Sequence, residues 1–222
     1  MSIEDYSDFN QNEKIPDSIG GYKILEVIAS GGMGRVYKAK SLENAQFYAI
    51  KQLLNPPQES TNDDWKRFMQ EARLAQTLEH PNIVRVPDWG IDNSNLYLVM
   101  EYIEGVPLSK ILEEEELPLE RILEIIYDIL MGLSYAHDKG IIHRDIKPSN
   151  IIIAPEGKAL IMDFGLAKNL FSAQKGITKI GQILGTLQYM SPEQALGDPN
   201  RISTLTDIYS TGAVLYELLT GL

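Results

Sequence analysis

The densest group of reactive side chains lies in one octapeptide, His-Arg-Asp-Ile-Lys-Pro-Ser-Asn, at residues 143–150. Asp145 and Asn150 are five residues apart and can face one site, Asp145 as a proton acceptor and Asn150 as a metal ligand. Lys147 adds a positive charge that would stabilise negative charge developing on a phosphoryl group. The spacing therefore suits the transfer of a charged group. A charged turn without chemistry is the competing interpretation.

The apolar runs around this octapeptide predict how it is held. Residues 140–142 and 151–153 are expected to form short buried strands on either side of the loop. A further short strand, residues 159–162, leads directly into the tripeptide Asp-Phe-Gly at 163–165. A carboxylate at the end of a strand offers the hard oxygen ligands that Mg²⁺ prefers.

A second candidate site lies nearer the N-terminus. A strand over residues 22–28 leads into a glycine-rich turn and a second strand, together residues 29–39. Gly31 and Gly34 would let backbone N–H groups approach phosphate oxygens closely, although a plain hairpin turn has the same pattern. A third strand follows and ends in Lys51. A dinucleotide-binding turn is excluded, because that turn opens a helix and this one opens a strand.

Apolar periodicity predicts the helices that position these segments. The first helix spans about residues 60–78, and two strands, residues 84–89 and 96–100, follow it. A third apolar helix extends over residues 207–220. The clearest helix lies between them and runs to His137. Its inner face is expected to hold Ile122, Ile125, Ile126, Ile129, Leu130 and Leu133.

Composition limits the class of protein. The 222 residues are 44% hydrophobic and 23% charged, which suits one large folded domain or two small lobes. The net charge of −11 argues against a general nucleic-acid-binding protein, which needs a basic face for the phosphates. The chain has no cysteine, so disulfides, cysteine-ligated zinc and a thiol nucleophile are excluded.

No targeting segment is predicted. Residues 1–21 are expected to form a flexible acidic leader, and they lack the basic start of a signal peptide. No uncharged run reaches the roughly 18 residues that a membrane helix needs. We therefore expect a cytoplasmic chain, or the cytoplasmic part of a longer membrane-anchored protein, with no membrane contact from this segment.

Taken together, residues 22–222 resemble the catalytic domain of bacterial Hanks-type serine/threonine protein kinases. Residues 143–150 match the catalytic loop H-R-D-x-x-x-x-N, and a lysine two residues after the aspartate is the serine/threonine version. The strand that ends in Lys51 and the Asp-Phe-Gly tripeptide match the family's lysine strand and metal-binding motif. Two departures are Ala29 for the first loop glycine and Ser191 for the alanine of Ala-Pro-Glu.

The resemblance implies an α+β fold with two lobes. The N-lobe, residues 22–100, would be a small antiparallel β-sheet with one regulatory helix. A hinge at residues 101–105 would join it to a mainly helical C-lobe, residues 106–222. The family's C-lobe has further helices beyond this point, so we expect the domain to be incomplete at its C-terminus.

Two consequences are expected from the missing helices. Glu193 would lack the buried arginine with which the family pairs it, a loss of ~3–5 kcal/mol. The last helix would also have one side uncovered, at Ile208, Val214, Leu215, Leu218 and Leu219.

The resemblance also implies roles for the catalytic side chains. Asp145 would accept the proton of the substrate hydroxyl, and Lys147 would offset charge on the moving phosphoryl group. Lys51, held by Glu71, would bind the α- and β-phosphates of ATP. For Glu71, a solvated carboxylate on the surface of a helix is the competing interpretation.

ATP and Mg²⁺ are the implied cofactors, with Mn²⁺ as an alternative metal. Asn150 and Asp163 would hold the metal. The nucleotide would be contacted from the glycine-rich turn, the lysine strand, the hinge and the strand after the catalytic loop. These residues are Ile28, Gly31, Gly34, Val36, Ala49, Lys51, Met100, Glu101, Ile103 and Ile152.

Regulation is implied by Arg144, because an arginine next to the catalytic aspartate needs a phosphate or carboxylate partner. In the activation segment before Ser191, Thr178 is the first candidate for the phosphate and Ser172 the second. Thr186 would bond Asp145 and Lys147 and help to select a serine or threonine acceptor.

The implied activity is ATP-dependent phosphorylation of serine and threonine hydroxyls in proteins, with autophosphorylation of the activation loop. The implied partners are ATP and protein substrates, without nucleic acid. A dimer that phosphorylates in trans is one compatible assembly. The alternative is a truncated fragment that binds nucleotide or partners without turnover.

Overall fold

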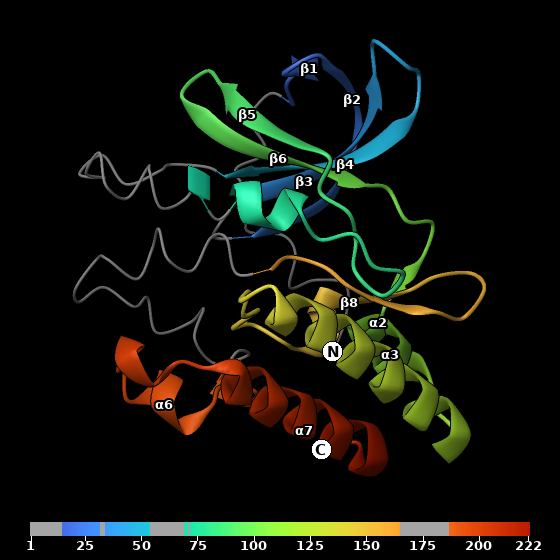
Figure 1. Cartoon of the computed structure of the whole chain (residues 1–222). Helices are drawn as coiled ribbons and strands as arrows, with labels where there is room; N and C mark the ends of the chain where they lie inside the picture. The colour runs from blue at the N-terminus through green and yellow to red at the C-terminus, as the bar shows by residue number, and fades with distance from the viewer. Residues whose placement is uncertain (1–14, 32–33, 54–68, 71, 165–186) are drawn as a thin grey trace.

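A computed structural model of the chain describes residues 15–31, 34–53, 69–70, 72–164 and 187–222. In Figure 1 a β-sheet forms one end of the molecule and the long helices form the other. The expected α+β fold with two lobes is confirmed.

The N-lobe contains a six-stranded antiparallel sheet in the order β1-β2-β3-β4-β6-β5. Its strands are β1 (Ser18–Ile19), β2 (Tyr22–Gly31), β3 (Gly34–Ser41), β4 (Phe47–Leu53), β5 (Asp88–Asp92) and β6 (Asn95–Glu101). The flexible leader expected over residues 1–21 extends too far toward the C-terminus, because Ser18 and Ile19 pair with β2 and the Ile19 side chain is fully buried. The sheet therefore begins before residue 22.

Both faces of this sheet are covered, which explains why the middle of β6 is apolar without interruption. Successive side chains of a strand point to opposite faces. One face packs against helical residues of the segment 72–76, and its buried residues are Leu53, Ala72, Ala75, Leu96 and Leu98. The other face holds Ile19, Ile24, Tyr37, Ala39, Ile50, Tyr97 and Val99. These two layers keep β4, which carries Lys51, in a fixed register beside β6.

The strand expected over residues 84–89 is wrong, because β5 begins only at Asp88. The residues before it connect the two lobes. The Val84 N–H donates to the Ile161 carbonyl oxygen at 2.8 Å, and Ile83 forms a parallel bridge with Ile161. The Arg85 carbonyl oxygen accepts from the Glu101 N–H of β6 at 2.9 Å, so this stretch bonds to both lobes before regular pairing with β6 begins at Asp88.

The C-lobe combines helices with a small antiparallel sheet in the order β7-β8-β9. The α-helices are α2 (Leu108–Glu114), α3 (Leu119–Asp138), α6 (Pro192–Ala195) and α7 (Thr204–Thr220). The short elements are β7 (Val106–Pro107), β8 (Ile151–Ile153), β9 (Ala159–Ile161) and the 3₁₀ turns η2 (Pro148–Asn150) and η3 (Pro199–Arg201). Within the described residues, no helix is both long and apolar enough to cross a membrane.

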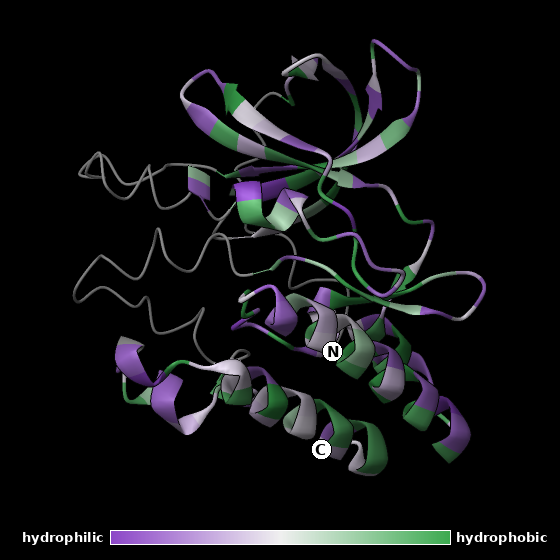
Figure 2. Ribbon diagram, viewed as in Figure 1, coloured by the Kyte–Doolittle hydropathy of each residue, from purple (hydrophilic) through white to green (hydrophobic). Residues whose placement is uncertain are grey.

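Helix α3 lies beside α7 (Figure 1) and supplies more residues to the C-lobe core than any other element. Hydrophobic and hydrophilic residues follow one another along α3 with the repeat of an amphipathic helix (Figure 2). The expected inner face is confirmed except at Leu130, which is 40% exposed. The buried residues of α3 are Ile122, Ile125, Ile126, Ile129, Gly132, Leu133 and Ala136.

Helix α7 begins at Thr204, three residues before the expected start at Asp207, because Ser203 caps it. The Ser203 hydroxyl oxygen accepts from the Leu205 N–H at 3.3 Å, and the Ser203 N–H donates to the Thr206 hydroxyl at 3.3 Å. These bonds satisfy the N–H groups of Ser203 and Leu205 at the start of the helix. The cap therefore places Asp207 inside the first turn of the helix.

The uncovered side expected on α7 is present only in part. Ile208 and Leu219 are exposed, whereas Val214 and Leu218 are buried against the α3 core. Leu215 is half-buried and packs against the same core. The expectation was therefore wrong for the two residues that face α3, since α3 itself covers them.

We predict that Ile129→Ala lowers the free energy of unfolding by about 2–5 kcal/mol, because it opens a cavity in the α3 core. The neighbouring change Leu130→Ala is the matched control and should change stability by less than about 1 kcal/mol. Thermal and urea unfolding of both variants would check this. Equal losses for the two variants would contradict the placement of α3.

Candidate active site

The catalytic loop is held by a buried carboxylate from another element. Asp207 of α7 is fully buried. Its Oδ2 accepts from the His143 N–H at 2.8 Å, and its Oδ1 accepts from the Arg144 N–H at 2.7 Å. Oδ2 also lies 2.8 Å from His137 Nε2, at the end of α3. The strand expected over residues 140–142 is wrong, because this stretch is irregular and the N–H groups of Gly140 and Ile141 donate back to the end of α3.

The backbone at Arg144 is unusual for a residue with a side chain. Its φ is +66°, in the left-handed region that usually requires glycine or asparagine. Such a conformation costs about 1–3 kcal/mol and persists only where the surroundings impose it. The two hydrogen bonds from Asp207 are part of those surroundings.

His143 connects the loop to the residues before the Asp-Phe-Gly tripeptide. It is fully buried, and its Nε2 lies 2.9 Å from the Met162 carbonyl oxygen. Its Nδ1 accepts from the Asp145 N–H at 3.1 Å, so the ring proton belongs on Nε2. Burial lowers the pKa of the His143 imidazole. The ring also packs edge-on against Phe164, with centroids 4.7 Å apart.

The structure brings together the three polar residues predicted for the catalytic loop. Lys147 Nζ lies 3.0 Å from Asp145 Oδ2, and Asn150 Nδ2 donates to the same oxygen at 3.0 Å. Asn150 Nδ2 also donates to the Asp145 carbonyl oxygen at 2.7 Å. The 3₁₀ turn η2 produces this arrangement, because it folds Asn150 back toward Asp145.

Lys51 and Asp163 meet across the two lobes. Lys51 Nζ lies 2.8 Å from Asp163 Oδ2, and both side chains are 17% exposed. Asp163 also has a left-handed backbone, with a φ of +62°. Glu71, the partner expected for Lys51, lies outside the described residues, as do Ser172, Thr178 and Thr186. Among the residues that the structure describes, Asp163 is the carboxylate that pairs with Lys51.

The residues proposed for the metal suit Mg²⁺. Asp163 offers a carboxylate, and Asn150 offers an amide oxygen, since its nitrogen already donates to Asp145. No group of three or more His, Asp or Glu residues that could hold a metal occurs in the described part of the chain. A metal here would therefore complete its coordination with oxygens of the nucleotide or water, as Mg²⁺ usually does.

Five of the ten residues proposed to contact the nucleotide fall into one apolar cluster between the lobes. Val36 and Ala49 come from the sheet, Met100 and Ile103 from the hinge region, and Ile152 from β8. Ile28 is not in this cluster and is 48% exposed on β2. The same cluster includes residues that the sequence analysis did not assign to the nucleotide, namely Val84, Val86, Ala154, Leu160 and Met162.

Met162 is the clearest of these missed residues, because it directly precedes Asp163 and belongs to both parts of the site. Its side chain packs in the apolar cluster, while its carbonyl oxygen accepts from His143. Its place just before the Asp-Phe-Gly tripeptide is the signal that could have identified it.

The hinge residues offer backbone groups to a ligand. The Glu101 N–H already donates to the Arg85 carbonyl oxygen at 2.9 Å. Of the two N–H groups at Glu101 and Ile103, that of Ile103 is therefore the one that could donate to a base. The Ile103 carbonyl oxygen accepts from the Gly105 N–H at 2.9 Å, which closes the hinge into a tight turn.

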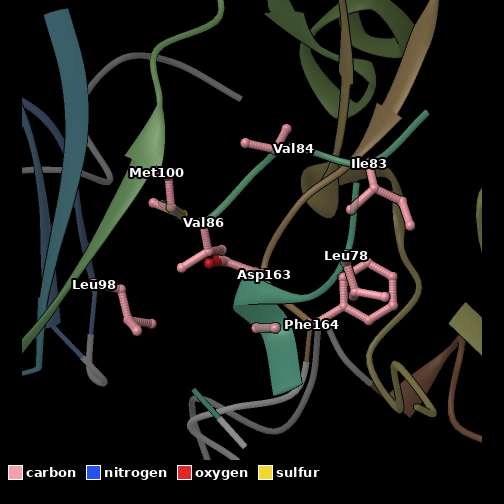
Figure 3. A pocket seen from close by; sticks show the side chains of 9 residues that line it. Leu78, Ile83, Val84, Val86, Leu98, Met100, Asp163 and Phe164 are labelled. Atoms are coloured by element: carbon pink, nitrogen blue, oxygen red, sulfur yellow. The ribbon is translucent and has the colours of Figure 1, made fainter. Parts of the chain in front are cut away.

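Behind Met100 lies a small apolar cavity (Figure 3). Asp163 and Phe164 line it from the C-lobe side, and Leu78 and Leu98 line it from the N-lobe side. Its volume is about 10 Å³, close to the minimum for one water molecule. Met100 therefore belongs to the apolar cluster and also lines this cavity.

The glycine-rich turn has a structural reason for one glycine. A Cβ atom at Gly34 would overlap the Gln52 carbonyl oxygen of β4, and the φ of Gly34 is +152°. Gly31 has no such neighbour. Ala29 lies in β2 opposite Val36, with no left-handed φ, so the family's missing first glycine introduces no backbone strain here.

The arrangement of a lysine-bearing sheet, a hinge and a catalytic loop defines the class of two-lobed phosphotransferases. A family model described as the protein kinase domain matches residues 22–222. The chain belongs to this family, whose members use ATP and a divalent metal ion and act on proteins.

Named relatives are bacterial serine/threonine-protein kinases. The chain is 38% identical to pkn2 of Myxococcus xanthus over 213 residues, which cover 93% of this chain and 25% of pkn2. It is 38% identical to PknB of Mycobacterium tuberculosis over 205 residues, 90% of this chain and 32% of PknB. The chain thus spans about a quarter to a third of the length of these curated relatives.

The crystal structure of the M. tuberculosis PknI kinase domain has a similar fold, with a TM-score of 0.75 and 25% sequence identity. The similarity covers 94% of this chain and 76% of that structure. The resemblance to bacterial Hanks-type kinases is therefore confirmed.

We predict that His143 makes the folded protein less stable as the pH is lowered. Burial holds its folded pKa below the unfolded value of about 6.5, so the unfolded state takes up the proton first as the pH falls. The free energy of unfolding should decrease below pH ~6.5, with a slope of up to ~1.4 kcal/mol per pH unit. Urea unfolding between pH 5.5 and 7.5 would measure this slope.

The controls are His143→Asn and His80→Asn. His143→Asn should flatten the slope, whereas His80→Asn should keep the His143 component, although burial also lowers the pKa of His80. A slope that is unchanged in His143→Asn would contradict a neutral, buried His143.

Proposed function

We propose that the chain is the catalytic part of an ATP-dependent serine/threonine protein kinase. The observation that carries this proposal is the contact of Lys147 and Asn150 with Asp145 Oδ2, each at 3.0 Å. This contact places a proton acceptor, a positive charge and a metal ligand around one point. The kinase names of the relatives support the same function.

In the proposed reaction, the oxygen of a serine or threonine hydroxyl forms a bond to the γ-phosphorus of ATP. The bond between this phosphorus and the β,γ-bridging oxygen breaks, and ADP leaves with that electron pair. Asp145 orients the hydroxyl and accepts its proton, and Lys147 offsets negative charge on the transferred group. The protein contributes position and electrostatics without a covalent intermediate.

The residues around the phosphates have separate roles in this proposal. Lys51 would bind the α- and β-phosphates, and it now pairs with Asp163. Asn150 and Asp163 would hold Mg²⁺, which would supply positive charge to the phosphate oxygens. The apolar cluster with Val36, Ala49 and Ile152 receives the base.

The wider context of the chain is also proposed. We place the N-lobe at residues 18–100, because its sheet begins at Ser18, the hinge at 101–105 and the C-lobe at 106–222. ATP as substrate favours a cytoplasmic chain or a cytoplasmic part of a longer protein. Autophosphorylation of Thr178, with Ser172 as the second candidate, would add a phosphate that Arg144 could bind, and a dimer would allow this reaction in trans.

The proposal is tested by incubating the 222-residue chain with Mg-ATP and casein as acceptor, followed by transfer of labelled phosphate and intact mass. Asp145→Asn should reduce transfer by about 10²–10⁴-fold, because the variant cannot accept the proton. Its ATP affinity should remain nearly unchanged. Lys51→Met should weaken ATP binding as well as transfer.

The matched control is Asp138→Asn, an exposed aspartate at the end of α3, which should keep full activity. If Asp145→Asn phosphorylates casein as fast as the unchanged chain, the proposed role of Asp145 is wrong. If the unchanged chain binds Mg-ATP but transfers no phosphate, the alternative of a nucleotide-binding fragment without turnover is favoured.

A further inference from the structure

A side-chain amide connects helix α6 to the catalytic loop. Gln194, in α6, donates from Nε2 to the Arg144 carbonyl oxygen at 2.7 Å. Its Oε1 accepts from the Ser191 N–H at 3.2 Å, and the Ser191 hydroxyl lies 3.3 Å from the same oxygen. One partner is a backbone acceptor and the other a backbone donor, so only one orientation of the amide satisfies both.

The bond from Gln194 acts on the peptide group that precedes the proposed proton acceptor. The carbonyl oxygen of the Arg144–Asp145 peptide accepts from Gln194, and the N–H of the same peptide donates to His143 Nδ1 at 3.1 Å. Both ends of this peptide group are therefore bonded. Its orientation determines where the Asp145 side chain leaves the backbone.

The strained φ of Arg144 makes these bonds necessary. Asp207 holds the N–H of Arg144, on one side of the left-handed residue, and Gln194 holds its carbonyl, on the other side. His143 Nδ1 holds the N–H end of the following peptide group, and Asp207 does not contact its carbonyl end. The bond from Gln194 fixes that carbonyl end.

We infer that Gln194 is a positioning residue for phosphoryl transfer, which fixes the Arg144–Asp145 peptide and so aims the Asp145 carboxylate. The inference rests on the proposed kinase function. Among the described residues, the side-chain hydrogen bonds of Gln194 go to Arg144 and Ser191, so we infer that it acts through Arg144. Helix α6 has a separate attachment, because Glu193 Oε1 accepts from the Thr206 hydroxyl at 2.6 Å. The Thr206 hydroxyl thus bonds the Glu193 carboxylate, which was expected to lack the family's arginine partner.

The test compares Gln194→Met, which keeps the length but removes the amide, with the control Ala195→Ser at an exposed position of α6. With casein and Mg-ATP, kcat should fall roughly 10- to 100-fold in Gln194→Met, while KM for ATP stays within about 2-fold. Ala195→Ser should keep kcat. Unchanged kcat in Gln194→Met would overturn the inference. A fall in kcat that is accompanied by a fall in melting temperature would also overturn it, because both would then come from local unfolding.

Two further variants separate the donor from the acceptor. Gln194→Glu keeps an oxygen for the Ser191 N–H but places a carboxylate oxygen against the Arg144 carbonyl, so its kcat should be the lowest. Gln194→Lys supplies a donor for the Arg144 carbonyl and should recover part of the activity that Gln194→Met loses. The reverse order would overturn the inference, because it would make the Ser191 contact the important one.

Backbone hydrogen exchange gives a readout that does not depend on activity. In Gln194→Met the amides of residues 143–146 should exchange about 10-fold faster than in Ala195→Ser, because the loop opens more often. If the unchanged chain transfers no phosphate, the proposed function fails, yet the exchange result still decides the role of Gln194. Equal exchange in the two variants would overturn that role.

Discussion

The hydrogen bonds between the Asp207 carboxylate and the catalytic loop are the interaction on which the site depends. A carboxylate removed from water is unfavourable unless hydrogen bonds replace its hydration. Asp207 receives them from two successive N–H groups of the loop and from the His137 ring. Helix α7, which packs into the C-lobe core, thereby also fixes the backbone of the catalytic loop. Folding of the core and formation of the site are therefore coupled.

The site is completed only where the two lobes meet. Lys51 is placed by its register in β4, opposite Leu98 of β6, whereas Asp163 follows β9 in the C-lobe. The 2.8 Å ion pair between them therefore reports how the lobes sit relative to each other. The bridge from Ile83 to Ile161 and the apolar cluster around Met100 hold the lobes on either side of that pair.

The sequence predicted the parts of the site that local chemistry determines. Asp145, Lys147 and Asn150 lie within six residues, so a single turn brings them together, and the repeat of α3 follows from its apolar spacing. The prediction of a strand over residues 84–89 failed because the apolar residues in this stretch contact the other lobe. The prediction that Leu130 is buried failed because the apolar repeat includes positions at the edge of the helix face, which remain exposed. Gln194 could not be assigned, since its contact with Arg144 joins segments 50 residues apart, whereas Met162 could have been assigned from its place before Asp163.

Backbone strain marks the same region as the chemistry. Asn93 and Ser94 have left-handed φ values in the hairpin between β5 and β6, where a tight turn requires them. Arg144 and Asp163 have left-handed φ values outside any hairpin, and each adjoins or is a proposed catalytic or metal-binding residue. Local backbone preference alone would return the φ of both residues to negative values. Asp207 holds the backbone of Arg144, and Lys51 holds the side chain of Asp163, so the conformations needed for chemistry are maintained by contacts from other elements.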